Sequence, residues 1–377
     1  MIAPRFRRLA ILAVAGVAAL GLTGCSHTVS DAATITYRDG AGSHTIHITR
    51  ADFEKQLGRL VGSTQFQTFL KSQNFPLAGD QKATTGPEIS TSYLGQLVDQ
   101  SAVDAEFASL KLTITTDLRS SAEQQTKQEF ALTNEISQDA SGNRTFIGPG
   151  AVYASFPKWL QTVLVDRAAR IDALGQYYSS ATPAKEQALY DEFASTICPS
   201  GRFVAQIQVA DAATANAILT QLQGGASFAD LAKAKSKDAN TAKTGGTVGC
   251  LSPTTVAKEF ETAAYAAPFG IPIGPVKSNL GYHVILVTHP TFADVQSELT
   301  PALQQNPLLA RDLRLQSMHV WVNPQFGSGA LAVDSQQGSL IFHVSAPAIP
   351  AARVCREASG ACSGTTTTTT VPTAPTG

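Results

Sequence analysis

The chain has 377 residues, of which 43% are hydrophobic and 15% are charged, and its formal net charge at pH 7 is −1. The length predicts two or three domains of ordinary size, each with enough apolar side chains for a packed core. The near-zero charge gives no sign of a basic surface that would bind nucleic acid, and nucleic acid is not an expected partner.

An arginine-rich start and a short apolar run mark residues 1–24 as a targeting signal. The run, "LAILAVAGVAALGL" at 9–22, is shorter than the ~20 residues that a membrane-spanning helix needs. It ends in "LTGC", which resembles a bacterial lipobox, where the cysteine is acylated and becomes the mature N-terminus. This resemblance implies a lipid anchor at Cys25 and a place on the extracytoplasmic face of the cell membrane. The alternative is an ordinary secretory signal that is cleaved a few residues further on.

A mostly helical region follows the signal. Residues 25–34 are interpreted as a tether, and the segment 34–61 predicts a β-hairpin turned by "DGAGS" and then a helix, with Thr49 and Asp52 as its capping box. Apolar residues at helical spacing predict further helices at 94–102, 117–136, 159–174 and 184–196. We therefore expect residues 35–197 to form a helical domain with a small β element at its start.

The predicted hairpin contains two histidines that are candidate metal ligands. His44 and His47 lie three positions apart in a strand, so their side chains are expected on opposite faces. Elsewhere no cluster of His, Cys, Asp and Glu has the spacing of metal ligands. The sequence therefore predicts no metal site.

From residue 198 the pattern changes to a compact unit of strands and helices. Alternating apolar residues predict a strand at 203–209, and a β-branched run predicts another at 282–288. Between them, two helices within 212–236 flank a Gly-Gly break, and a further helix is predicted at 256–264. We read the unit as β-α-α-β-α-β.

The chain after Pro290 is predicted to be ordered for only a short distance. Helical segments at about 292–306 and 307–317 lead to the strand-like "HVWVNPQFG" at 319–327, which is expected to close the ordered part. Residues 328–377 are predicted to be mostly irregular, with a disordered Thr/Pro-rich tail that lacks an apolar face.

The stretch 198–290 resembles the parvulin family of prolyl isomerases. The resemblance rests on "GGASFADLA", on "GGTVG" followed by "EFETAAYA", on "GPVKSNLGYHVILV", and on their spacing. The wider order of segments is similar to the extracytoplasmic foldase lipoproteins of Gram-positive bacteria and to periplasmic chaperone-isomerases. It implies an α+β fold in which 35–197 and 291–327 pack into one mostly helical, chaperone-like module. The parvulin domain, a small antiparallel sheet surrounded by helices, is inserted into that module.

The implied reaction needs neither a nucleophile nor a cofactor. An X–Pro bond crosses between isomers over a barrier of about 18–20 kcal/mol, which makes the exchange slow enough to limit folding. An isomerase holds the proline ring in an apolar pocket and stabilises the twisted amide by placed hydrogen bonds. The implied partners are unfolded or nascent secreted polypeptides that contain X–Pro bonds, together with the membrane through the N-terminal lipid.

The resemblance assigns apolar and polar positions of the site. Phe260, Val256 and Tyr265 match residues that line the proline pocket, although the same spacing would suit plain core positions on a helix. His283 matches the second of two central histidines, and a structural role for a buried histidine is the alternative. Gln206 stands where the family has its first histidine, and glutamine cannot change charge near pH 7.

Other positions also depart from the family pattern. Ala239 stands where active relatives have Cys or Asp, and a shift of one residue would place Asp238 there. Thr247 and Cys250 replace a usual Asp and a usual aromatic residue. Because losing one hydrogen-bonding partner costs about 1–3 kcal/mol, we predict weakened rather than absent isomerase activity. The alternative is a chaperone or peptide-binding lipoprotein whose parvulin domain is catalytically degenerate.

Export permits disulfide bonds, and four cysteines remain beyond the lipobox. Four cysteines allow three connectivities, which sequence alone does not distinguish. Because one pair falls in the parvulin-like region and one near the C-terminus, the preferred pairing is Cys198 with Cys250 and Cys355 with Cys362. A free, buried Cys250 is the alternative.

Overall fold

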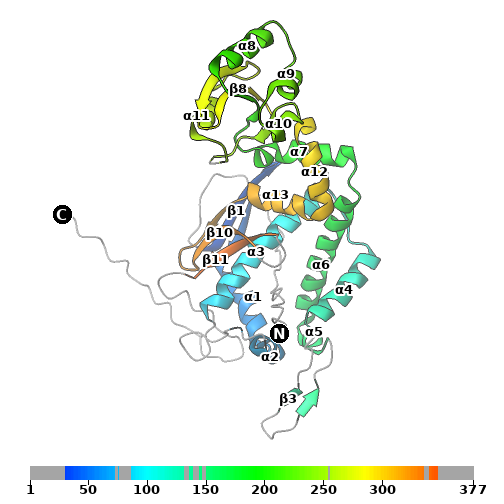
Figure 1. The fold of residues 1–377 in the computed structure, drawn as a ribbon. Coiled ribbons are helices and arrows are strands. Elements are labelled where there is room, and N and C mark those ends of the chain that lie inside the picture. The colour runs from blue at the N-terminus through cyan, green and yellow to red at the C-terminus, as the bar shows by residue number, and fades with distance from the viewer. Residues whose placement is uncertain are drawn as a thin grey trace, which may run out of the picture. The chain divides into compact units, whose positions relative to one another are not determined.

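The chain divides into two compact units, which we call unit 1 (Met1–Gly175 with Arg314–Gly377) and unit 2 (Gln176–Leu313). The computed structural model describes residues 30–72, 75, 86–130, 136–138, 144–146, 150–253, 255–334 and 339–346. The signal and the cysteines at 25, 355 and 362 lie outside these ranges. None of the helices within the described ranges combines the length and the hydropathy that a membrane crossing requires. Figure 1 labels the helices and some of the strands of both units.

Unit 1 contains a three-stranded antiparallel sheet in the order β2-β1-β9. Its strands are β1 (Asp31–Asp39), β2 (Gly42–Thr49) and β9 (His319–Val322). The fully buried Ile35 lies opposite Ile46 on one side and Val320 on the other, so segments far apart in the sequence share this sheet. Because the buried start of β1 begins at Asp31, the prediction of a tether over residues 25–34 is wrong for its last four positions.

The histidines of the hairpin are engaged by separate carboxylates. His44 Nε2 lies 2.7 Å from Asp39 Oδ1, and His47 Nδ1 lies 2.7 Å from Asp31 Oδ2. Across the part of the chain that the structure describes, no group of three or more His, Cys, Asp or Glu side chains could hold a metal ion.

Helices and a short hairpin complete the first part of unit 1. These elements are α1 (Arg50–Gly62), α2 (Thr64–Ser72), α3 (Pro87–Ser109), α4 (Thr116–Glu129), β3 (Ile136–Gln138), β4 (Arg144–Phe146), α5 (Ala151–Ser155) and most of α6 (Lys158–Ser179). Thr49 caps α1 by accepting the Asp52 N–H, as the sequence predicted. Aromatic rings of α2 and of the residues that end α4 and α5 meet in the core of unit 1. There Phe130 and Phe156 pack edge to face, with ring centroids 5.1 Å apart.

The prediction that the ordered part of the chain ends at residue 327 is wrong, because two more strands follow. β10 (Ser328–Val333) and β11 (Leu340–Ser345) form an antiparallel hairpin. Phe342 and Val344 are buried in the core of unit 1, and the Phe342 N–H donates to Asp99 of α3 at 2.8 Å. A Cβ on Gly95 of α3 would lie 2.5 Å from the Phe342 carbonyl oxygen, so the helix needs a glycine for this strand to pack closely.

Unit 2 is built around a four-stranded antiparallel sheet in the order β6-β5-β8-β7. Its elements are α7 (Pro183–Ile197), β5 (Phe203–Val209), α8 (Ala212–Gln223), α9 (Phe228–Lys235), α10 (Ala239–Ala242), β6 (Thr247–Cys250), α11 (Lys258–Ala266), β7 (Ile273–Ser278), β8 (Gly281–Thr288), α12 (Phe292–Gln305) and most of α13 (Leu309–Ser317). Ile207 and Val284 face α8 and α9, whereas Val204 and Ile285 face α11. The predicted α+β class, with small antiparallel sheets among helices, is confirmed.

Strand β7 was not predicted because Gly274 and Pro275 interrupt its pattern. Gly274 has a φ of 144°, and a Cβ there would lie 2.7 Å from the His283 carbonyl oxygen. Only glycine lets β7 approach β8 this closely, so the residue that hides the strand from sequence analysis is the one that allows the pairing.

Candidate active site in unit 2

Three predicted site residues from separate elements meet on one face of the sheet. Gln206 of β5 and His283 of β8 share a face because these neighbouring strands pair with Gln208 opposite His283. His283 Nδ1 lies 2.9 Å from Gln206 Oε1. Gln206 Nε2 in turn donates to Asp238 Oδ2 at 2.8 Å, from the loop that begins α10. The structure therefore connects Asp238, Gln206 and His283 in one chain of hydrogen bonds.

The direction of this chain follows from the chemistry of its first member. An ionised carboxylate only accepts hydrogen bonds, so the Gln206 amide must turn its NH₂ group toward Asp238 and its oxygen toward His283. His283 Nδ1 then carries the proton and donates it to that oxygen. The other ring nitrogen, Nε2, is left as an acceptor for the Ser278 hydroxyl, whose oxygen lies 2.7 Å away. One tautomer of His283 is thereby fixed.

Burial shifts the pKa values of the two titratable residues of this network, His283 and Asp238, in opposite directions, and neighbouring groups oppose each shift. Burial lowers the pKa of His283, and the negative charge of Asp238 only partly opposes this. Burial raises the pKa of Asp238, but hydrogen bonds from Thr241, Asn240 and Gln206 outweigh that effect and leave it below its ordinary value. At neutral pH the site therefore holds a carboxylate at one end and a neutral imidazole at the other.

The predicted apolar pocket residues differ in their environments. The Phe260 ring meets the His283 ring edge to face, with centroids 5.4 Å apart, but only 2% of Phe260 is exposed. Val256 is half-buried against the same hydrophobic cluster. Tyr265 is 38% exposed and is not part of that cluster. The structure thus places Phe260 beside His283 and Val256 against the cluster that contains Phe260, and it leaves Tyr265 on the surface.

Ser278 and Thr241 belong to the site although the sequence analysis did not select them. Ser278 is on β7, where alternation gives it the same face as Val276, the partner of His283. Thr241 donates its hydroxyl to Asp238 Oδ2 at 2.8 Å, three positions further along the chain. Two sequence signals would have found them. Ser278 is a polar residue across a hairpin from a histidine, and Thr241 is a threonine three positions after an aspartate.

A disulfide bond joins the end of α7 to the edge strand β6 of this sheet. Cys198, at the end of α7, is joined to Cys250 of β6, with their Cα atoms 5.5 Å apart. Cys250 lies opposite Phe203 in the sheet, so the bond fastens the edge strand β6 next to the residues that precede β5. Cys250, at a position where the resemblance implies an aromatic residue, is thus used for this bond.

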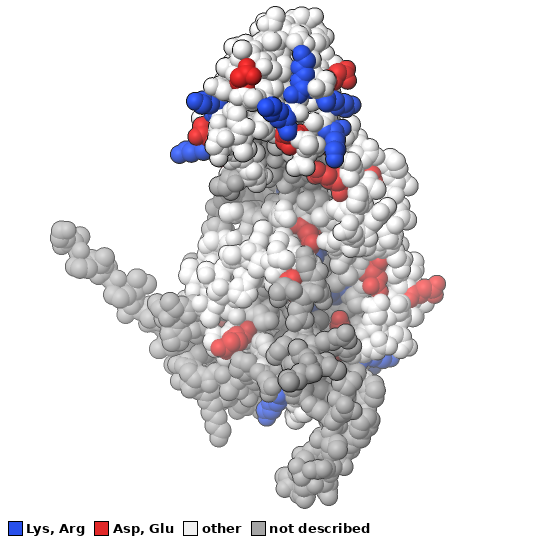
Figure 2. All heavy atoms as spheres, in the orientation of Figure 1, with Lys and Arg blue, Asp and Glu red and all other residues white. Residues whose placement is uncertain are grey.

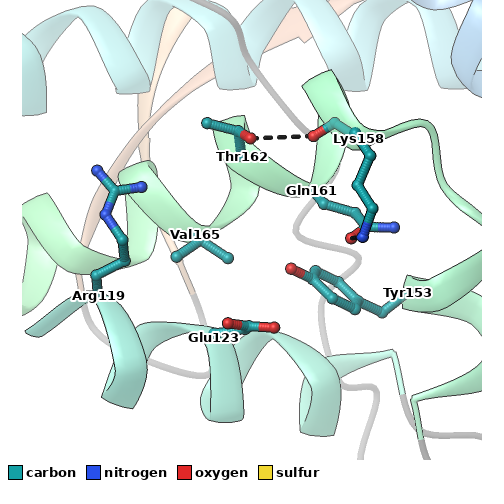
Figure 3. A pocket seen from close by; sticks show the side chains of 7 residues that line it. All are labelled: Arg119, Glu123, Tyr153, Lys158, Gln161, Thr162 and Val165. Carbon is teal, nitrogen blue, oxygen red and sulfur yellow. Dashed lines mark hydrogen bonds between the residues drawn. The ribbon is translucent and has the colours of Figure 1, made fainter. Parts of the chain in front are cut away.

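A hollow of about 230 Å³ lies elsewhere, in unit 1, and is lined by Arg119, Glu123, Tyr153, Lys158, Gln161, Thr162 and Val165 (Figure 3). Three of its polar side chains are engaged by the protein. Arg119 pairs with Asp166, Glu123 pairs with Lys127, and the Gln161 amide donates to the Phe156 carbonyl. Chemistry is therefore better supported at the His283 network than in this hollow.

Comparisons with known proteins place the same region in a family. A family model described as Rotamase, PPIC-type PPIASE domain, matches residues 204–289. The chain is 40% identical over 106 residues to "Foldase protein PrsA" of Geobacillus sp. (strain WCH70), covering 27% of this chain and 38% of that protein. It is 40% identical over 100 residues to "Foldase protein PrsA 2" of Bacillus cereus, covering 26% and 35%. The chain thus spans well under half the length of these relatives.

Solved structures with similarity to the chain were also found. NmPin, the parvuline of Nitrosopumilus maritimus, is 34% identical, and the match covers 23% of this chain and 95% of that chain with a TM-score of 0.22. PrsA from Bacillus subtilis is 18% identical, and the match covers 74% of this chain and 89% of that chain with a TM-score of 0.27. The family model spans the chain from β5 to the end of β8. The domain formed by residues 204–289 therefore belongs to the PPIC-type peptidyl-prolyl isomerases, the parvulin family.

Proposed function

We propose that this protein is an extracytoplasmic foldase that accelerates cis/trans isomerisation of X–Pro bonds in unfolded secreted polypeptides. The observation that carries the proposal is the chain of hydrogen bonds from Asp238 through Gln206 to His283, whose ring packs edge to face with that of Phe260. A histidine held in one tautomer beside an apolar cluster suits a reaction that involves no covalent step.

The energetic demand of the reaction is modest. A 10⁴-fold acceleration needs a barrier lower by about 5–6 kcal/mol. In the twisted amide the proline nitrogen loses its conjugation and becomes a better hydrogen-bond acceptor, while the carbonyl regains ketone character. Apolar contact with the ring excludes water, and one or two preorganised hydrogen bonds stabilise the twisted amide more than the planar one. Gln206 and Ser278 engage both ring nitrogens of His283, so the imidazole contributes as the fixed wall beside Phe260 and as part of the preorganised polar network.

We propose further that the activity is weaker than in relatives with two histidines. Gln206 preserves a hydrogen bond at this position but cannot take up a proton. Its amide is also held by Asp238, so its orientation cannot adjust to the substrate without breaking that bond.

A second candidate is a chaperone whose parvulin domain binds peptide without turnover. The 2% exposure of Phe260 leaves little of its ring surface for holding a proline during catalysis, and this keeps the second candidate in view. Both candidates predict binding of apolar, proline-containing segments, and they differ in catalysis alone.

The test is the exchange rate of short X–Pro peptides, measured by NMR exchange spectroscopy with and without the protein. Catalysis predicts acceleration that falls in His283→Gln and persists in the matched control His343→Gln, an exposed histidine of β11. Acceleration by neither wild type nor variants, with retained suppression of aggregation of an unfolded client, would instead establish the chaperone.

The membrane anchor has its own experiment. The short apolar run before Cys25 supports a lipid-modified N-terminus. Cys25→Ser should move the protein from the membrane fraction to the soluble fraction, with the loss of the lipid mass. A variant that stays in the membrane fraction with unchanged mass would refute the anchor.

A further inference from the structure

One exposed leucine lies directly beside the proposed site. Among the described residues the exposed large hydrophobic side chains are Tyr265, Phe269, Ile271, Leu280, Leu331 and Val333. Leu280 is 63% exposed and occupies the tight turn between β7 and β8. An aliphatic side chain in a hairpin turn contributes little to folding, because it remains in water in the folded state.

The backbone of Leu280 is held on both sides by residues next to His283. Its N–H donates to Ser278 Oγ at 3.0 Å, and the same hydroxyl contacts His283 Nε2. Its carbonyl accepts a 2.7 Å hydrogen bond from Gln208 Nε2, and Gln208 lies directly opposite His283 in the sheet. The leucine is therefore two hydrogen bonds away from the imidazole, and its side chain is presented from a fixed main chain.

The charges near this turn do not favour an acidic neighbour of the proline. Lys277 alternates with Ser278 along β7, so its side chain faces the other side of the sheet. Lys237, whose N–H donates to the Gln208 carbonyl, lies within electrostatic range of the Asp211 carboxylate. Figure 2 shows blue and red side chains interspersed over the visible surface of unit 2 rather than one field of positive charge. A neutral, apolar side chain is the group that suits this rim.

We propose that Leu280 determines specificity: it contacts the side chain of the residue adjoining the proline and favours a large apolar residue there over a small or charged one. The proposal rests on the proposed function, since it deepens the specificity of the same site. Removing the leucine should leave the His283 network intact, because both hydrogen bonds of Leu280 come from its backbone.

The test uses peptides with Ala, Leu, Phe, Lys or Glu before the proline, and a second set with the same residues after it. Wild type should isomerise the Leu and Phe peptides of one set with a kcat/KM about fivefold above Ala, the order expected from burying one or two methylene groups. The difference should lie in KM, because the contact is made equally in the ground and transition states. Leu280→Ser should reduce this preference to within about twofold.

Ile271→Ser is the matched control, because Ile271 is 58% exposed in the same unit but lies before β7, at the end opposite the turn. It should retain the apolar preference, and unchanged thermal unfolding of both variants excludes misfolding. Equal preference in wild type and Leu280→Ser, or none in wild type, would overturn the inference.

If no peptide is isomerised by wild type, the proposed catalysis fails and the inference is decided by binding. NMR titration with the same peptides should then give a Kd preference for Leu and Phe that Leu280→Ser loses and Ile271→Ser keeps. Equal Kd values across the peptides would reject a role for Leu280 in recognition.

Discussion

Arg314 and Glu106 form an ion pair inside unit 1, with side chains that are 0% and 2% exposed. Arg314 Nε and Nη2 both donate to Glu106 Oε2, at 3.1 and 3.0 Å, and Nη1 donates to the Arg38 carbonyl. The guanidinium also lies over the Tyr37 ring, 5.6 Å from its centroid. One side chain thus links α13 to α3 and to β1.

Breaking this pair should destabilise unit 1 strongly. Arg314→Met leaves the Glu106 carboxylate buried without its cation, which typically costs about 3–5 kcal/mol. The double variant Arg314→Met/Glu106→Leu should recover much of that loss, since two apolar side chains replace two buried charges. Urea unfolding monitored by circular dichroism measures both. Lys127→Met, from the exposed pair with Glu123, is the control and should cost less than about 1 kcal/mol. An equally small effect of Arg314→Met would contradict the argument.

Replacing Gln206 should lower kcat/KM markedly, although the glutamine side chain is uncharged. Gln206→Leu removes the acceptor of the His283 Nδ1–H and one donor to Asp238, and an unsatisfied buried group costs about 1–3 kcal/mol. We expect kcat/KM to fall about tenfold to 100-fold, and the ¹⁵N shifts of His283 should report a mixture of tautomers. Gln206→His should be more active than wild type. Unaltered ¹⁵N shifts in Gln206→Leu would show that the amide does not fix the tautomer.

The residues of this network show which parts of the candidate site can be predicted from the sequence. His283 and Gln206 were selected by alignment with the family pattern, and Asp238 by a shift of one residue from Ala239; the structure joins all three by hydrogen bonds. The direction of the hydrogen bonds was not predictable, because it depends on which amide atom faces the carboxylate. Ser278 was missed for a related reason: its contact with His283 depends on β7, which Gly274 and Pro275 conceal.

Packing sets a different limit on prediction. Helical spacing places Phe260 on the inner face of α11, but the spacing is the same for a pocket wall and for a core residue, and the ring is almost fully buried. Strands β10 and β11 were missed because their stability comes from contact with α3, at Gly95 and Asp99, which no local pattern reveals.

The buried imidazole predicts a pH dependence with a definite sign. The pKa of His283 is lowered in the folded state from an ordinary value of 6.5, so the unfolded chain binds the proton more readily. Stability from this group is fully present above about pH 6.5 and is lost as the pH falls toward the lower folded pKa. The urea midpoint of unit 2 should therefore drop between pH 7 and pH 5 in wild type and drop less in His283→Gln. The pKa of Asp238 is also lowered in the folded state, so the stability that this carboxylate contributes is lost only at more acidic pH. A midpoint that rises on acidification over this range would contradict the assignment.

The disulfide between Cys198 and Cys250 should carry much of the stability of unit 2. It joins residues 52 positions apart, and closing a loop of that length is worth about 4 kcal/mol in the chain-entropy account. β6, which has four residues and lies at the edge of the sheet next to β5, depends on this bond to stay in register near Gln206. We expect the double variant Cys198→Ser/Cys250→Ser to unfold at lower urea concentration and to lose isomerase activity before unit 1 unfolds. Reductant should shift wild type in the same direction and leave the variant unchanged, which separates this bond from any other thiol effect. A variant with the wild-type midpoint would show that β6 is held by its sheet contacts alone.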